Sequence, residues 1–218
     1  MIFHRAHQGR RVGAAAAAAA FVFSCGLAAT AHAQDRLPPI PRDKLTPAQK
    51  EAISAYEGTR DALRGPWWPM LRAPQSVKLL MPWSEYLRHG SSLSPKIYEM
   101  VIIVTAREWS QAFSFDGHSQ RALTNGLKPE IVKAIAEGRR PKDMAADEEA
   151  AYDFSTELHH NHSVSDATYA KALATFGEQG IIDIIGVNGH YTLISMVLNT
   201  ARTPAPADAK GRLERFPN

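Results

Sequence analysis

The chain of 218 residues contains a single cysteine, Cys25. It lies within the first 33 residues, so a chain that has lost that segment carries no thiol. Such a chain has no disulfide, no thiolate nucleophile and no cysteine ligand for a metal ion. Its fold must be held by a hydrophobic core alone, and the remaining length of about 185 residues suffices for one domain.

The sequence also lacks an excess of charge beyond its N-terminus. It has 25 Lys and Arg against 22 Asp and Glu. Three of the basic residues are Arg5, Arg10 and Arg11, which leaves 22 charges of each sign in the rest of the chain. A balanced chain offers no basic surface for polyanions. We therefore expect no nucleic-acid partner and, for the mature chain, no stable insertion in a membrane.

The N-terminal segment has the composition of a secretory signal peptide. Its arginines precede an apolar, alanine-rich run over residues 12–29, and Ala31 and Ala33 follow with the spacing of a cleavage site. This pattern predicts a signal peptide over residues 1–33, cleavage near Ala33 and a periplasmic or secreted protein. A retained membrane anchor is the alternative, but an alanine-rich run partitions weakly into lipid. The Arg10-Arg11 pair leaves general and twin-arginine export both open.

The remainder is organised as a proline-rich arm over residues 34–45, a helical domain over residues 46–200 and a polar tail over residues 201–218. Thr46-Pro47 and Ser94-Pro95 each place an N-cap residue before a proline at the first helical position, and Pro74 and Pro129 also mark helix starts. The predicted class is all-α. Helices are expected over residues 46–64, 74–89, 95–109, 114–124, 129–137, 147–161, 165–176 and 179–200, with an aromatic connection over residues 67–70.

Glu99 is the first candidate for chemistry. It lies in a predicted helix that is apolar on nearly every side, with Ile102 and Ile103 one turn further on. Burial raises the pKa of a carboxyl group and prepares it for proton transfer. The alternative is that Glu99 faces outward or pairs with an arginine such as Arg88 or Arg121.

His118 is the second candidate. It lies in the helix after that of Glu99, and two helices joined by a tight connection run antiparallel. This arrangement places a residue early in one helix beside a residue late in the next. Glu99 and His118 then form a relay in which the carboxylate orients the imidazole. A structural histidine is the alternative.

Several short motifs, spread over nearly the whole mature chain, resemble the carboxymuconolactone decarboxylase-like family. The motifs are Gly65-Pro66, Leu71, Pro74, Tyr86-Leu87-Arg88, Glu99, Ala106-Arg107, Phe115, His118, Ala122, Gly126-Leu127, Tyr152-Asp153-Phe154, Val164-Ser165-Asp166, Phe176-Gly177-Glu178 and Asn188-Gly189-His190-Tyr191. The resemblance implies an alkylhydroperoxidase D-like helical bundle built around an antiparallel helix pair. It also implies a homo-oligomer, either a trimer or a hexamer.

The family has a redox branch that resembles alkylhydroperoxidase D, in which two cysteines stand between the glutamate and the histidine. Here Gln111 and Ser114 occupy those two positions. Thiol-based peroxide reduction needs one thiolate to attack oxygen and a second thiol to resolve the product. Peroxidase activity is therefore not expected.

The branch without these cysteines resembles the decarboxylase itself, which needs neither metal nor organic cofactor. The resemblance implies a decarboxylase, or a related proton-transfer lyase or isomerase, acting on a small carboxylated lactone or enolisable acid. His118 is the expected proton donor and acceptor, oriented by Glu99. Gln111 and Ser114 are expected to donate hydrogen bonds to the substrate, and Arg107 to bind its carboxylate. A surface or intersubunit salt bridge is the alternative for Arg107.

Trp67 and His190 are further candidates for the wall of a substrate pocket, with a place in the core as the alternative for each. The cluster of His159, His160 and His162 sits at a polar helix end, and no metal site is expected there. A binding or assembly protein that keeps the fold without the chemistry is the alternative function. Burial of Glu99 beside His118 and an open cavity would favour the enzyme.

Overall fold

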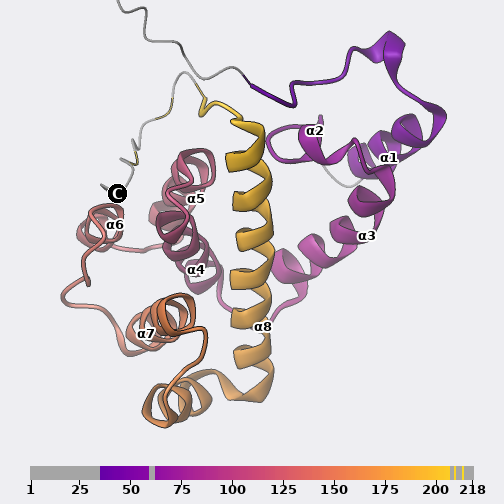
Figure 1. Ribbon diagram of the computed structural model, residues 1–218. Coiled ribbons are helices and arrows are strands. Elements are labelled where there is room, and N and C mark those ends of the chain that lie inside the picture. Colours follow the sequence, from indigo (N-terminus) through magenta and orange to yellow (C-terminus); the bar gives the residue numbers. More distant parts are fainter. Residues whose placement is uncertain (1–34, 59–61, 207–208, 210–212, 214–218) are drawn as a thin grey trace, which may run out of the picture. The chain divides into compact units, whose positions relative to one another are not determined.

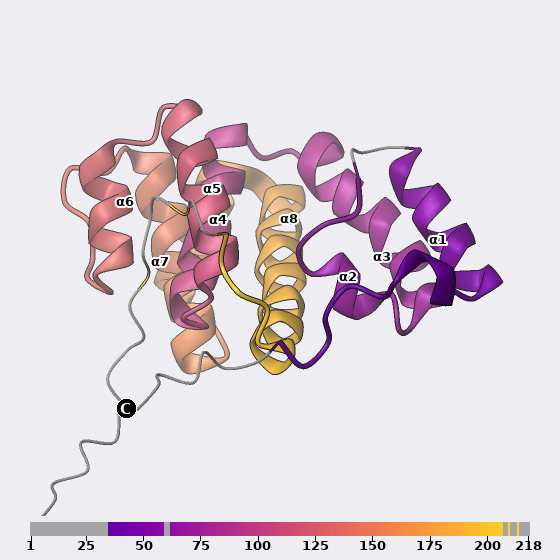
Figure 2. The same ribbon diagram turned by 90° about the horizontal axis from the view of Figure 1, so that it is seen from above.

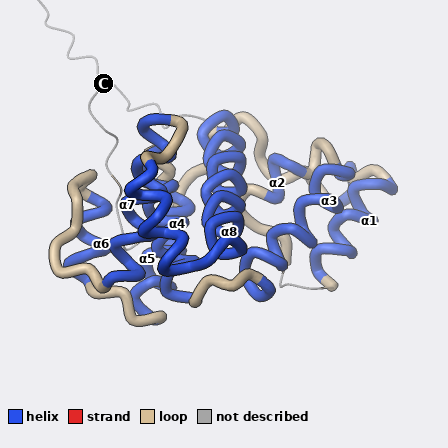
Figure 3. The backbone as a smooth tube through the Cα atoms, turned by 90° about the horizontal axis from the view of Figure 1, so that it is seen from below, coloured by secondary structure: helices blue, strands red, loops and turns tan. Residues whose placement is uncertain are grey.

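The structure is a computed structural model that describes residues 35–58, 62–206, 209 and 213; the predicted signal peptide lies outside these residues. All regular structure in the described part is helical (Figure 3), which confirms the all-α prediction. The helices are α1 (Pro47–Glu57), α2 (Trp67–Met70), α3 (Pro74–Glu85), α4 (Pro95–Glu108), α5 (Ala112–Thr124), α6 (Pro129–Ala136), α7 (Ala146–Asn161) and α8 (Asp166–Ala201). A 3-10 turn, η1 (Arg42–Lys44), precedes α1, and a π-helical turn, η2 (Tyr86–Gly90), continues α3.

The predicted helix starts are confirmed by their capping hydrogen bonds. The Gln49 amide donates to Thr46 Oγ1 at 3.3 Å and the Thr46 amide donates to Gln49 Oε1 at 3.0 Å, which forms a capping box. Ser94 Oγ accepts from the Ile97 amide at 3.3 Å. Each of these caps satisfies a backbone donor that the first turn of a helix leaves without a partner.

Three boundaries differ from the prediction. Helix α1 ends at Glu57, before residue 64, and residues 67–70 form the short helix α2 instead of a connection. The two expected C-terminal helices are consecutive segments of α8, separated at Gly177. Gly177 has a φ of 68° and a ψ of 178°, a conformation that glycine adopts without steric cost.

Helix α8 runs lengthwise between two groups of helices (Figures 1 and 2). On one side lie α4 and α5, with α6 and α7 beyond them; on the other side lie α1, α2 and α3. Helix α4 contacts α5, α6, α7 and α8 and is buried over most of its length. Within the described chain, α8 alone is long and apolar enough to cross a membrane by length and composition, but more than half of its most apolar stretch is buried in the fold.

The carboxylate of Asp183 connects α8 to η2 and to the loop after it. It accepts hydrogen bonds from the Tyr86 hydroxyl at 2.7 Å, from the Ser92 amide at 2.8 Å and from Ser92 Oγ at 2.8 Å. Asp183 itself is buried. Since η2 carries Arg88, this contact also fixes one wall of the site described below.

We expect Asp183→Ala to lower the free energy of unfolding by about 3 kcal/mol, because three donors lose a charged acceptor and the Ser92 amide is left without its partner. Glu130→Ala, at an exposed acidic position of α6, is the matched control and should change the stability by less than about 0.5 kcal/mol. Denaturant unfolding of the two variants measures both values. Equal stabilities would show that the Asp183 contacts do not hold the fold.

Candidate active site

Glu99 and His118 meet between α4 and α5. His118 Nδ1 lies 2.6 Å from Glu99 Oε2, and the side chains of both residues are almost completely buried. Glu99 is in the first half of α4 and His118 is at the middle of α5, and the two helices run antiparallel, as predicted. The structure thus brings together the pair that the spacing indicated.

The second oxygen of Glu99 faces arginine. Arg121 Nε donates to Glu99 Oε1 at 3.3 Å, and the positive charge of Arg88 also acts on the carboxylate. The sequence allowed either a pair with His118 or a pair with an arginine. In the structure Glu99 forms both. Burial raises the pKa of Glu99, but the His118 hydrogen bond and the two arginines outweigh it and hold the pKa below its usual value. The expected raised pKa is wrong because the sequence could not show these partners.

His118 is neutral at neutral pH. Burial lowers its pKa to about 4, against the opposing effect of the Glu99 carboxylate. With Glu99 ionised, we assign the ring proton to Nδ1, which donates to Glu99 Oε2. Nε2 then carries the lone pair and makes no hydrogen bond to any described residue. In this state His118 acts as a base, and it becomes a proton donor only after accepting a proton.

Two tyrosines support the imidazole of His118, and neither was predicted from the sequence as a site residue. The ring of Tyr191 packs edge-on against His118 with centroids 4.9 Å apart, and its hydroxyl lies 3.3 Å from that of Tyr98. The guanidinium of Arg88 lies over the Tyr98 ring, 5.7 Å from its centroid. These contacts hold the His118 ring in one orientation. Tyr98 lies one residue before Glu99 and Tyr191 one residue after His190, but nothing in their spacing indicated that they meet.

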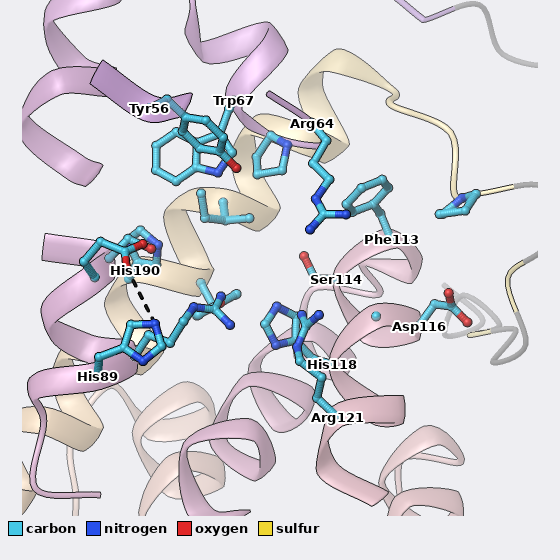
Figure 4. Close-up of a pocket in the computed structure, with 18 of the residues that line it drawn as sticks. Tyr56, Arg64, Trp67, His89, Phe113, Ser114, Asp116, His118, Arg121 and His190 are labelled. Carbon is cyan, nitrogen blue, oxygen red and sulfur yellow. Dashed lines mark ion pairs between the residues drawn. The ribbon is translucent and has the colours of Figure 1, made fainter. Parts of the chain in front are cut away.

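His118 lines a cavity of about 770 Å³ (Figure 4). Its walls come from α1, α2, α3, η2, α5 and α8, so helices distant in the sequence converge on it. Trp67 and Tyr56 lie on one side and His118 and Arg121 on the other. Its lining residues are Tyr56, Glu57, Arg64, Pro66, Trp67, Ser84, Glu85, Arg88, His89, Phe113, Ser114, Asp116, Gly117, His118, Arg121, His190, Tyr191, Ile194 and Pro206.

Three arginines line this cavity: Arg64, Arg88 and Arg121. Arg121 is committed to Glu99, whereas Arg64 enters from the segment before α2 and Arg88 from η2. A guanidinium in a partly buried wall binds carboxylate with paired, charge-assisted hydrogen bonds. A cavity of this size with arginines beside a neutral histidine suits a small carboxylic acid.

Three of the predicted substrate contacts lie in the cavity and two do not. Ser114, Trp67 and His190 line it. Gln111 does not, because its side chain caps α5 by accepting from the Phe113 and Ser114 amides at 2.7 and 3.3 Å.

Arg107 also lies outside the cavity. It is buried, donating to the Ala136 carbonyl at 3.1 Å and to Ser110 Oγ at 2.8 Å, and it borders a separate cavity of about 100 Å³. Arg107 faces α6 because it stands two turns after Glu99 and on another side of α4. The prediction that Arg107 binds the substrate is therefore not supported, and Arg64, Arg88 and Arg121 are the arginines that line the cavity with His118.

The three neighbouring histidines are dispersed. His159 Nε2 lies 2.9 Å from Asn188 Oδ1, His160 pairs with Glu108 at 3.0 Å, and His162 adopts a left-handed conformation after α7. Within the described residues no group of three histidine, cysteine or acidic side chains could hold a metal ion.

The lowered pKa of His118 predicts a pH-dependent stability. Between about pH 6.5 and pH 4 the unfolded chain binds a proton that the folded chain does not, so the stability falls as the pH falls through this window. At about 1.4 kcal/mol per pKa unit, the loss from this group is about 3 kcal/mol between pH 7 and pH 4. Denaturant unfolding at the two pH values should show this loss in the wild type and a smaller one in His118→Asn. Parallel losses in both proteins would contradict the lowered pKa.

No protein-family model and no curated protein matches the chain. Two solved structures are similar in fold. A protein of unknown function from Agrobacterium tumefaciens, described as an antioxidant defence protein of the AhpD type, is 16% identical with a TM-score of 0.57, over 64% of this chain and 96% of the other. The debrominase Bmp8 in its apo form is 12% identical with a TM-score of 0.64, over 81% of this chain and 95% of the other.

These similarities define the class of fold. The chain has the AhpD-like all-α fold, as the resemblance implied.

Proposed function

We propose that this protein is a proton-transfer enzyme that acts without an organic cofactor on a small carboxylated lactone or enolisable acid, as a decarboxylase or a related lyase or isomerase. One observation carries the proposal. A neutral histidine, held through Nδ1 by a buried carboxylate 2.6 Å away, presents its other ring nitrogen at the wall of a cavity of about 770 Å³. This is the arrangement of a positioned general base.

The chemistry follows from the charge on each side chain. His118 Nε2 accepts a proton from an acidic C–H or from water, and Glu99 stabilises the imidazolium that forms. The imidazolium then returns the proton to carbon. For a decarboxylation, Nε2 of His118 takes up a proton from solvent when the anionic substrate binds. The C–C bond electrons then pass into the conjugated system as carbon dioxide leaves, and the carbanion takes this proton from His118. A bound anion favours the protonated imidazole, so substrate binding raises the pKa of His118 toward neutral pH.

Arg88 and Arg64 are the proposed carboxylate-binding groups. Both line the cavity that His118 enters, and Ser114 on the same wall carries a hydroxyl that donates hydrogen bonds to an oxyanion. Trp67 and Tyr191 supply apolar surface for a conjugated ring. Export through the predicted signal peptide would place the substrate among small acids outside the cytoplasm.

Thiol-dependent peroxide reduction is not part of the proposal. The antioxidant description belongs to the Agrobacterium protein, whereas here Gln111 caps a helix and Ser114 lines the cavity at the positions of the family's cysteines. We expect the purified protein to consume no peroxide with dithiothreitol as the reductant, measured against a no-protein blank. Thiol-dependent turnover by a Cys25→Ser variant would contradict this expectation, because that variant has no cysteine.

The proposal is tested on a panel of small acids that includes carboxymuconolactone. Carbon dioxide release detects decarboxylation, and deuterium uptake from D₂O at carbon detects proton transfer without carbon loss. We expect at least one acid to react and the reaction to be lost in His118→Ala and Glu99→Gln with folding intact. Turnover unaffected by either change would refute the site. Binding of the acids without any turnover would favour a binding protein on the same fold.

A further inference from the structure

The second segment of α8 has an exposed apolar face that no described helix covers. Its exposed apolar side chains are Ile182, Ile185, Leu193 and Met196, which are 62%, 42%, 36% and 46% exposed. With Gly189 they fall on one side of the helix, since their spacings of three, four, four and three residues follow the helical period. No charged residue lies between Asp183, which is buried, and Arg202. A stripe of this kind marks an interaction site.

The stripe is symmetric about Gly189. Ile185 and Leu193 lie four residues to either side, and Ile182 and Met196 lie seven residues to either side. A second copy of α8 that runs antiparallel and crosses at Gly189 therefore places Ile185 against Leu193 and Ile182 against Met196. Such self-complementarity is the property of a two-fold interface, in which the same patch serves both subunits.

Gly189 permits the close approach that this crossing needs. A Cβ atom added to it would meet no atom within 4 Å, so the protomer does not require glycine there for space. Its φ is also not in the left-handed region. Glycine in the middle of a helix costs stability relative to alanine. Its place at the centre of the exposed stripe is explained by a partner helix, because small residues allow two helix backbones to come close.

The charges at the two ends of the stripe are complementary in the same orientation. Glu178 begins the segment, while Arg202 follows its last turn and Arg36 donates to the Thr200 carbonyl beside it. Glu178 and Arg202 are exposed, and neither forms an ion pair with a described residue. Because Gly189 is close to the midpoint between them, an antiparallel copy brings Glu178 of each protomer near the arginines of the other.

We propose that two copies of this chain associate through this stripe, with a two-fold axis at Gly189. A cyclic trimer has no such axis, so the interface requires an assembly with an even number of subunits. The neighbouring residues His190, Tyr191 and Ile194 face the cavity from the other side of the same helix. The interface thus supports the helix that forms one wall of the site.

The first test is Gly189→Arg, which places a charged side chain at the axis. We expect the wild-type mass from light scattering to be an even multiple of the protomer mass and the variant to have half of it or less. Ala174→Arg is the matched control, an exposed position of α8 outside the stripe, and should leave the mass unchanged. Circular dichroism verifies folding. A wild type that is monomeric at all concentrations, or a Gly189→Arg protein with the wild-type mass, overturns the proposal.

The second test is a cross-link. In a Cys25→Ser background, Gly189→Cys supplies the single cysteine of the chain. Mild oxidation of the Gly189→Cys variant should form a disulfide between the two protomers at position 189, because a disulfide forms where two Cα atoms approach within about 7 Å. Ala174→Cys is the control and should remain uncross-linked. Equal cross-linking of both variants, or none of Gly189→Cys, contradicts the proposal, as does a monomer that uses the stripe to bind phosphatidylcholine vesicles.

Discussion

His118→Ala is expected to lower kcat by about 10²- to 10⁴-fold on whichever acid of the panel reacts, because it removes the only base that Glu99 holds at the cavity wall. The change should be larger in kcat than in KM, because the imidazole transfers a proton in the transition state and does not bind the substrate carboxylate. Steady-state kinetics at pH 7 measures both constants.

His160→Ala is the matched control for this loss. His160 is exposed, pairs with Glu108 and lies outside the cavity, so its removal should leave kcat within about two-fold of wild type. A His118→Ala protein that retains a third or more of the wild-type kcat would mean that another group moves the proton.

Arg88→Gln is expected to raise KM by about 30-fold or more with a smaller change in kcat, because a partly buried guanidinium that binds a carboxylate contributes 2 kcal/mol or more. Arg88 reaches the cavity from η2 and lies over the Tyr98 ring. Its side chain is therefore held in place before the substrate arrives, which lowers the entropic cost of binding. Initial rates over a range of substrate concentrations separate the two constants.

Arg107→Gln separates the structural assignment from the expectation based on the sequence. Arg107 lies outside the cavity, where it donates hydrogen bonds to the Ala136 carbonyl and to Ser110 Oγ. The substitution should therefore lower stability while leaving KM unchanged. A rise in KM for Arg107→Gln that matches or exceeds that for Arg88→Gln would restore Arg107 as the carboxylate-binding group.

The sequence predicted the helices well because their signals are local. Thr46, Ser94 and the prolines that follow them satisfy or remove backbone donors within one turn, so they mark a helix start regardless of the tertiary fold. The antiparallel pairing of Glu99 with His118 was predictable for the same reason, since one tight connection joins their helices.

The rest of the site depends on contacts between distant segments. Tyr191 reaches His118 from α8, while Arg64 and Arg88 line the cavity from the segment before α2 and from η2, so no periodicity on one helix reveals them. Arg107 was misplaced because it lies two turns beyond Glu99 on α4 and faces α6, which the sequence could not show. The direction of the Glu99 pKa shift failed likewise, since it is decided by partners on α5 and η2.

The most direct test of the account is the ionisation of His118. The ring nitrogen and carbon chemical shifts of His118 in the labelled protein, followed from pH 8 to pH 3.5, report both its protonation and its tautomer. We expect a neutral ring with the proton on Nδ1 at pH 7. We also expect the pKa of His118 to be about 4 and to fall further in Glu99→Gln. A ring that is doubly protonated at pH 7, or that carries its proton on Nε2, would contradict it.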